Sequence, residues 1–275
     1  MTTFFTSFIS EILTEERDFI SFCQKEKKLR WFLAFAVLIF WGIKIINHNI
    51  FIDSEIMSLE PYGLLQSWYG SKRFGLILTK KLFHYAHLVP YLSNLLFAGT
   101  LWFDALLLCF CIRRWFSLDM ISASKWDMYL LTALFISCPS LAEQFVFTLQ
   151  AFEIILAMGF CIIAAFCADQ AIHAKKSILW CCPALFFLVW SLGSYQSFSS
   201  FYIALVLISF LGSYEHNNNQ PFRSAICHIA LFSLGFILNI VVGDVLCLIK
   251  GGDSSYVEGM FLWGHIPYSQ SLQYI

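Results

Sequence analysis

Long apolar runs recur along the chain at the length that a membrane crossing requires. A helix needs about 20 mainly apolar residues to span a bilayer core. Runs of this kind lie at approximately 31–47, 91–112, 127–146, 151–168, 177–193, 199–213 and 225–249. The sixth run is short, and Pro139 interrupts the third. The pattern predicts an all-α polytopic membrane protein with about seven transmembrane helices.

The composition supports a membrane protein and excludes an ordinary soluble domain. Of the 275 residues, 59% are hydrophobic and 13% are charged, and the mean hydropathy is +0.71. Soluble domains carry about 25% charged residues. A net charge of −1 gives no indication of nucleic-acid binding. The ten cysteines lie mostly inside apolar runs and lack the spacing of zinc ligands, so we interpret them as small buried hydrophobes.

Basic residues near the ends of the runs predict the orientation of the chain. The segment KEKKLR (25–30), Arg113, Arg114 and the lysines at 175–176 fall on one side of the membrane. The positive-inside rule makes this side cytoplasmic. We therefore expect a cytoplasmic amphipathic segment at 1–30, a transmembrane domain at 31–249 and an extracytoplasmic tail at 250–275.

The first outer loop, 48–90, is the longest loop between the predicted spans. Its second half, SKRFGLILTKKLFHYAHL (71–88), predicts an amphipathic interfacial helix. The apolar stripe comprises Phe74, Ile77, Leu78, Leu82, Tyr85 and Leu88, and the basic face, expected to meet water or headgroups, comprises Arg73, Lys80, His84 and His87. Basic residues on the outer side break the positive-inside rule. They indicate either anchoring by snorkelling side chains or recognition of a lipid phosphate.

Two carboxylates, Asp53 and Glu55, follow the first span within the segment NIFIDSEIMSLEPYG (49–63). Most of their neighbours are apolar, and a partly desolvated carboxylate is a stronger base than a solvated one. The position beside the membrane would suit a sugar whose phosphate carrier stays in the bilayer. The alternative is that both are solvated loop acids.

Four motifs in order along the chain resemble the bacterial type II Gtr family, within the GT-C class of membrane glycosyltransferases. They are HNIFIDSEIMSLEPYG (48–63), YGSKRFGLIL (69–78), CPSLAEQF (138–145) and GSYQSFSSFY (193–202). The family's acidic cluster often has adjacent carboxylates, whereas Ser54 separates Asp53 from Glu55 here. The sequence therefore leaves open which carboxylate acts.

The resemblance implies an inverting hexosyltransferase of the bacterial inner membrane. It would move a sugar, expected to be glucose, from a polyprenyl-phosphate carrier to a surface glycan such as lipopolysaccharide O-antigen. On this basis we assign the base to Asp53, a helper or metal-ligand role to Glu55, and the lipid phosphate to Arg73 with Lys80 in support. Two carboxylates at this spacing could also bind Mg²⁺ or Mn²⁺, which the sequence does not decide.

Further polar residues are expected at the outer ends of the predicted spans. Glu143 and Gln144 follow Pro139, and Tyr195 and Gln196 lie between the fifth and sixth runs. Carboxylates, amides and an aromatic ring suit sugar recognition. The alternative is that these residues cap helix ends.

Two other functions remain open from the sequence. A transporter or flippase of lipid-linked sugars would use the intramembrane carboxylates Asp104, Glu153 and Asp244 as an ion path. Such folds often contain an inverted repeat, and none is detected. The third possibility is an inactive, truncated relative, because members of the GT-C class are usually longer than this chain.

Overall fold

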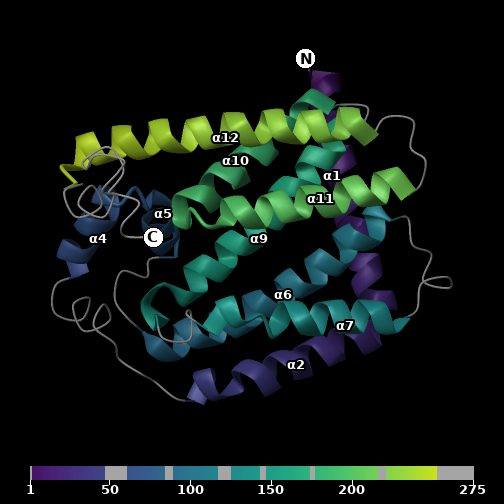
Figure 1. Cartoon of the computed structure of the whole chain (residues 1–275), viewed down its shortest axis with the longest axis horizontal. Coiled ribbons are helices and arrows are strands. Elements are labelled where there is room, and N and C mark those ends of the chain that lie inside the picture. The colour runs from purple at the N-terminus through teal and green to yellow at the C-terminus, as the bar shows by residue number, and fades with distance from the viewer. Residues whose placement is uncertain are drawn as a thin grey trace, which may run out of the picture.

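The computed structural model describes residues 2–46, 61–83, 89–116, 125–142, 147–173, 177–215 and 221–252. These residues form helices and contain no strand. The elements are α1 (Thr2–Lys25), α2 (Lys27–Ile46), α4 (Pro61–Gly70), α5 (Phe74–Leu82), α6 (Pro90–Trp115), α7 (Lys125–Ile136), a 3₁₀ turn η1 (Pro139–Leu141), α9 (Thr148–His173), α10 (Ser177–Ser194), α11 (Phe198–Glu215) and α12 (Pro221–Lys250). Figure 1 shows the long helices lying roughly side by side.

Five helices of the described part are long and apolar enough to cross a membrane: α2, α6, α9, α11 and α12. The chain is therefore a multi-pass α-helical membrane protein, as its apolar runs predict. The predicted fifth span is the shorter apolar helix α10. The predicted third span, 127–146, differs most, because α7 ends at Ile136 and the short turn η1 begins at Pro139. Proline lacks the N–H that a continuing helix would need.

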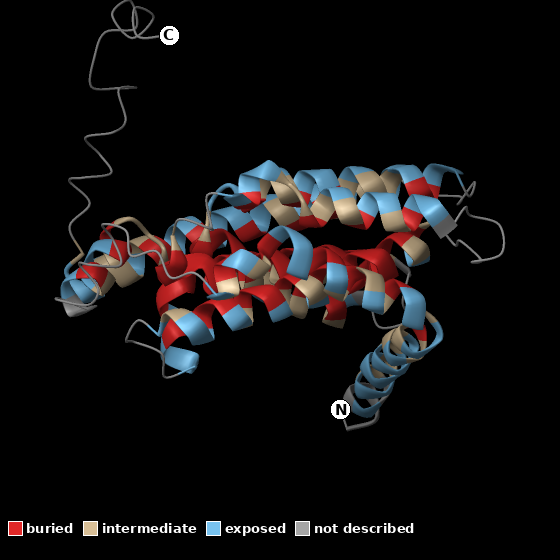
Figure 2. Cartoon of the chain, turned by 90° about the horizontal axis from the view of Figure 1, so that it is seen from below, coloured by how far each residue is buried: buried red, intermediate tan, exposed pale blue. Residues whose placement is uncertain are grey.

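Helix α9 occupies the centre of the bundle and packs against α5, α6, α10, α11 and α12. Figure 2 shows the buried residues gathered in the middle of the bundle. Small residues line α9, including Ala151, Ala157, Ala164, Ala165 and Ala168, all of which are buried. Small side chains allow helix backbones to approach closely, which is a main source of helix association in membranes.

Most of the N-terminal segment expected at 1–30 forms the helix α1. It contacts α2 and α6, and its Phe19 ring packs edge-on against Phe103 and Phe110. Helix α1 also reaches α10, since Trp180 Nε1 donates a hydrogen bond of 3.2 Å to the Glu11 carboxylate. Helix α1 thus contacts both α6 and the first turn of α10.

Candidate active site

Helix α5 is packed into the bundle, which corrects the prediction for the interfacial helix. Lys80 was expected on a face towards water, yet only 2% of its surface is exposed. Leu78 and Leu82 of the predicted apolar stripe are exposed instead, while Phe74 and Ile77 are buried. Lysine is rarely buried without a partner. The helix turns its lysine inward because a carboxylate on α9, 73 residues further along the chain, is there to meet it.

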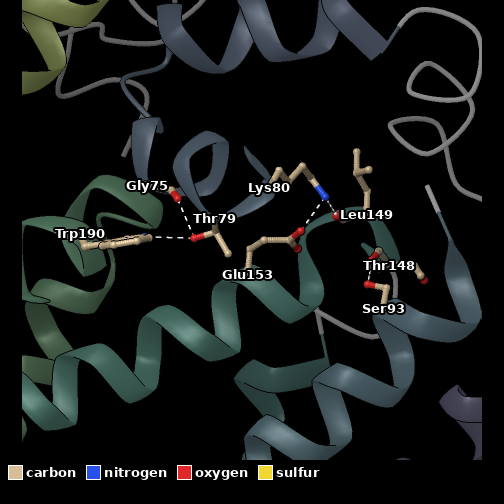
Figure 3. Close-up of polar contacts among 8 residues, drawn as sticks. All are labelled: Gly75, Thr79, Lys80, Ser93, Thr148, Leu149, Glu153 and Trp190. Atoms are coloured by element: carbon tan, nitrogen blue, oxygen red, sulfur yellow. Dashed lines mark hydrogen bonds and ion pairs between the residues drawn. The ribbon is translucent and has the colours of Figure 1, made fainter. Parts of the chain in front are cut away.

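That carboxylate belongs to Glu153. Lys80 Nζ lies 2.6 Å from Glu153 Oε1, and the same ammonium donates a hydrogen bond of 2.8 Å to the carbonyl of Leu149 (Figure 3). Glu153 has no exposed surface. The Trp68 ring of α4 lies 5.9 Å from Lys80 Nζ, within the range of a cation–π contact. A buried pair of this kind joins α5 to the first turns of α9.

Helix α5 is also held against α10. The Thr79 hydroxyl accepts a hydrogen bond of 3.0 Å from Trp190 Nε1 and donates one of 2.9 Å to the Gly75 carbonyl (Figure 3). A Cβ atom at Gly75 would collide with the Ser194 hydroxyl and the Trp190 carbonyl oxygen. Glycine at position 75 therefore permits the close crossing of α5 and α10.

The end of the bundle around α5 is joined by further hydrogen bonds. The Ser93 hydroxyl of α6 donates to the Thr148 carbonyl at 2.9 Å (Figure 3), and the Asn94 amide donates to the Lys44 carbonyl of α2 at 2.7 Å. The C-terminal end of α2 and the N-terminal ends of α6 and α9 therefore meet beside α5.

Arg73 and Tyr195 are two of the predicted site residues that the structure brings together. Arg73 precedes α5, and its guanidinium carbon lies 5.7 Å from the centre of the Tyr195 ring. Tyr195 follows α10 and its backbone N–H bonds to the Ser191 carbonyl. No carboxylate of the described residues forms an ion pair with Arg73. Its charge is thus held by an aromatic face and remains available to an anion.

The other predicted site residues are placed as follows. Gln196 is exposed and directly follows Tyr195. Asp53 and Glu55 belong to residues 47–60, and Glu143 and Gln144 belong to residues 143–146, so these four lie outside the described residues. Among the described residues no group of three His, Cys, Asp or Glu side chains could hold a metal ion.

Sequence analysis missed the partners of two charged residues. Lys80 pairs with Glu153, and Lys72, just before α5, pairs with Asp244 of α12 at 2.5 Å. Glu153 and Asp244 were both interpreted as intramembrane carboxylates, and both lysines lie in the predicted outer loop, 48–90, where basic residues break the positive-inside rule. Matching the two sets of anomalies by charge could have suggested these pairs.

Comparison with known families decides the class of the protein. The family described as Glucosyl transferase GtrII matches residues 42–273. The chain belongs to the GtrII family. No curated protein and no solved structure matches the chain. Membership makes the chain a membrane glycosyltransferase and confirms the resemblance seen in the four motifs, all of which lie inside the matched residues.

Proposed function

We propose that this GtrII protein transfers glucose from a polyprenyl-phosphate carrier to a surface glycan such as lipopolysaccharide O-antigen. The reaction would take place on the extracytoplasmic side of the bacterial inner membrane, with the N-terminus in the cytoplasm. The observation that carries the proposal is the Arg73 guanidinium, which is half-buried, stacked on Tyr195 and without a described carboxylate partner. A guanidinium fork binds the oxygens of a phosphate or a carboxylate through two parallel hydrogen bonds, and a lipid phosphate would supply such oxygens.

The order of the helices along the chain supports a position for the acidic segment 47–60 at the end of the bundle that contains Arg73 and Tyr195. Residues 47–60, which carry Asp53 and Glu55, join the end of α2 at Ile46 to the start of α4 at Pro61. Helix α4 packs on α5, and the last turn of α2 bonds to α6 beside the start of α9. Residues 143–146 end just before α9 begins. The described ends that flank residues 47–60 and 143–146 thus belong to helices that meet beside α5, which supports the proposal.

The proposed step is a displacement at the anomeric carbon with inversion. Asp53 takes the proton from an acceptor hydroxyl as its oxygen forms the new bond to the anomeric carbon. The bond from that carbon to the phosphate oxygen breaks, and its electron pair leaves on the lipid phosphate. Arg73 stabilises this developing charge. General-base help contributes about 10²–10⁴ in rate, and charge stabilisation is often the larger effect.

The remaining predicted residues take supporting roles in this proposal. Glu55 assists Asp53 or, where the reaction uses Mg²⁺ or Mn²⁺, would act as a ligand of that cation, which would help to neutralise the phosphate charge. Tyr195, Gln196, Glu143 and Gln144 contact the sugars. Lys80 supports the phosphate site from within the bundle, because its pair with Glu153 holds α5, and α5 begins directly after Arg73.

The test uses the full-length protein in nanodiscs with radiolabelled polyprenyl-phosphate glucose and isolated O-antigen. We expect Asp53→Asn to lower transfer by at least about 10²-fold and Arg73→Met by a similar factor. Asp127→Asn is the matched control, since Asp127 is an exposed carboxylate on α7. Equal transfer by wild type and Asp53→Asn would remove Asp53 from the mechanism. Absence of transfer in the wild type would reject the donor or the acceptor.

A further inference from the structure

The turn between α4 and α5 has a backbone conformation that is unusual for its residue. Lys72 has a φ of 58°, in the left-handed region that glycine normally occupies. Two hydrogen bonds define the end of α4: Arg73 N–H donates to the Trp68 carbonyl at 2.8 Å, and Lys72 N–H donates to the Tyr69 carbonyl at 3.1 Å. This is the Schellman arrangement, in which glycine is the usual residue at the left-handed position. A lysine there is strained.

The Lys72 side chain reaches across to α12. Its ammonium lies 2.5 Å from Asp244 Oδ1. Gly243 lies under the stem of this side chain, and a Cβ atom added there would approach the Lys72 Cβ to 3.1 Å. The neighbouring α4 is fixed to the same helix end, since the Gln66 amide donates to the carbonyls of Lys250 and Gly251. The C-terminal part of α12 therefore holds both α4, through Gln66, and the turn that follows it, through Lys72.

We propose that the Lys72–Asp244 pair is a tether that positions Arg73 for the donor phosphate. Arg73 is the next residue along the chain and the N-cap of α5, so the turn sets the direction in which its side chain leaves the backbone. A glycine at position 72 would form the same turn without strain but could not reach Asp244. Residues in strained backbone conformations cluster at functional sites. The role assigned to Arg73 rests on the proposed function.

Because the Lys72–Asp244 pair is exposed, its effect on the position of Arg73 can be separated from an effect on the stability of the protein. The Lys72 and Asp244 side chains are 39% and 48% exposed. The exposed fractions place the pair at the surface of the bundle and outside its packed core, so its loss leaves the core contacts intact. Loss of the pair should therefore leave the thermal midpoint near that of the wild type. A change at Arg73 would then arise from the altered turn and not from unfolding.

The experiment compares wild type, Asp244→Asn and the exchanged pair Lys72→Asp with Asp244→Lys. The exchange keeps the combined length of the two side chains, and aspartate tolerates the left-handed conformation. Lys250→Met is the control, an exposed lysine at the end of the same helix. Phenylglyoxal labelling of Arg73 in nanodiscs, read by mass spectrometry, reports its accessibility without any substrate. Transfer kinetics with polyprenyl-phosphate glucose report its function.

We expect Asp244→Asn to raise the labelling rate of Arg73 several-fold and to raise KM for the donor about ten- to a hundredfold, the scale of a misplaced positioning group. The exchanged pair should restore both, and Lys250→Met should alter neither. Unchanged labelling in Asp244→Asn would overturn the tether. Faster labelling with unchanged KM would overturn its role at the donor phosphate. If the exchanged pair restores neither the labelling rate nor KM, loss of the ion pair is not the cause of the changes in Asp244→Asn, and the proposal is overturned. If the wild type transfers no glucose, the proposed function fails while labelling still decides the tether.

Discussion

Lys80 and Glu153 form an ion pair of 2.6 Å between α5 and α9, and neither side chain has more than 2% of its surface exposed. A buried pair is costly to break from one side, because the remaining charge loses its counter-charge in a place that water does not reach. Replacing both partners by apolar residues of similar size is often neutral. The pair therefore offers a direct way to separate structural from functional roles of Lys80.

We expect Glu153→Gln to destabilise the protein by about 3–5 kcal/mol. The thermal midpoint in detergent should fall by more than about 5 °C. The double variant Lys80→Met with Glu153→Leu should recover most of this loss and retain transfer activity. Lys72→Met with Asp244→Asn, a pair at the surface of the bundle, is the control for the thermal midpoint alone. A well-folded double variant without activity would show that the Lys80 charge itself contacts the donor.

The crossing of α5 and α10 depends on the absence of a side chain at Gly75. We expect Gly75→Ala to lower both the thermal midpoint and the transfer rate. Two of the three atoms nearest to an added Cβ are the Trp190 carbonyl oxygen and the Ser194 backbone nitrogen, which cannot rotate away as a side chain can. Gly99→Ala is the matched control: Gly99 also lies in a helix, and no heavy atom lies within 4 Å of an added Cβ. Alanine there should leave stability unchanged or raise it by up to about 1 kcal/mol. Equal effects at the two positions would contradict the close-crossing interpretation.

Apolar periodicity was sufficient to predict the helical membrane fold, and motif order was sufficient to predict the family. The predicted orientation of α5 was wrong, and the reason is physical. Its own sequence favours Leu78 and Leu82 as buried residues and Lys80 as an exposed one. The opposite arrangement depends on Glu153, far along the chain, and local periodicity carries no information about such a partner.

The candidate site could be predicted only in part. Arg73 and Tyr195 were each singled out, but 122 positions separate them, and only the packing of α5 on α10 shows that they meet. The placement of Lys72 by Asp244 likewise follows from tertiary structure. The assignments of Asp53, Glu55, Glu143 and Gln144 stay predictions, since these residues lie outside the described residues.

The Tyr195 ring is expected to hold the Arg73 guanidinium in place. Cation–π contacts contribute about 0.5–2 kcal/mol, depending on solvent exposure. Tyr195→Leu should therefore raise KM for the donor about three- to thirtyfold, whereas Tyr195→Phe keeps the ring and should behave like the wild type. Steady-state transfer assays on both variants make the comparison. A defect in Tyr195→Phe as large as in Tyr195→Leu would assign the effect to the hydroxyl, as expected for direct sugar recognition.

Asp104 distinguishes a glycosyltransferase from a transporter. It is buried on α6 against Gly159 of α9, and its Oδ2 atom has no hydrogen-bond partner among the described residues. An uncharged amide of the same shape should be tolerated there, because burying a charge is costly. We expect Asp104→Asn to retain transfer and the thermal midpoint of the wild type. Loss of function with a normal midpoint would favour an ion path through Asp104.

Glu15 makes the attachment of α1 sensitive to pH. Its Oε1 atom lies 2.8 Å from Arg114 Nη2 of α6, while its Oε2 atom is buried without a hydrogen bond in the described structure. Burial raises the pKa of Glu15 above its ordinary value of 4.5, the nearby Arg114 charge offsets part of this rise, and the carboxylates of Asp18, Asp169 and Glu11 add to it. The packed state therefore binds a proton more tightly than the unpacked state.

The sign of the pH dependence follows from this raised pKa. The stabilising contribution of protonated Glu15 is fully present below about 4.5, the value in the unpacked chain, and is lost as the pH rises through the higher pKa of the packed state. Hydrogen exchange of α1, corrected for the intrinsic pH dependence, should show protection that falls as the pH rises above about 4.5. Glu15→Gln should remove this trend, since glutamine does not titrate, whereas Glu16→Gln, at an exposed neighbour, should keep it. Protection that rises with pH in the wild type would instead show that the Arg114 pair outweighs the cost of burial.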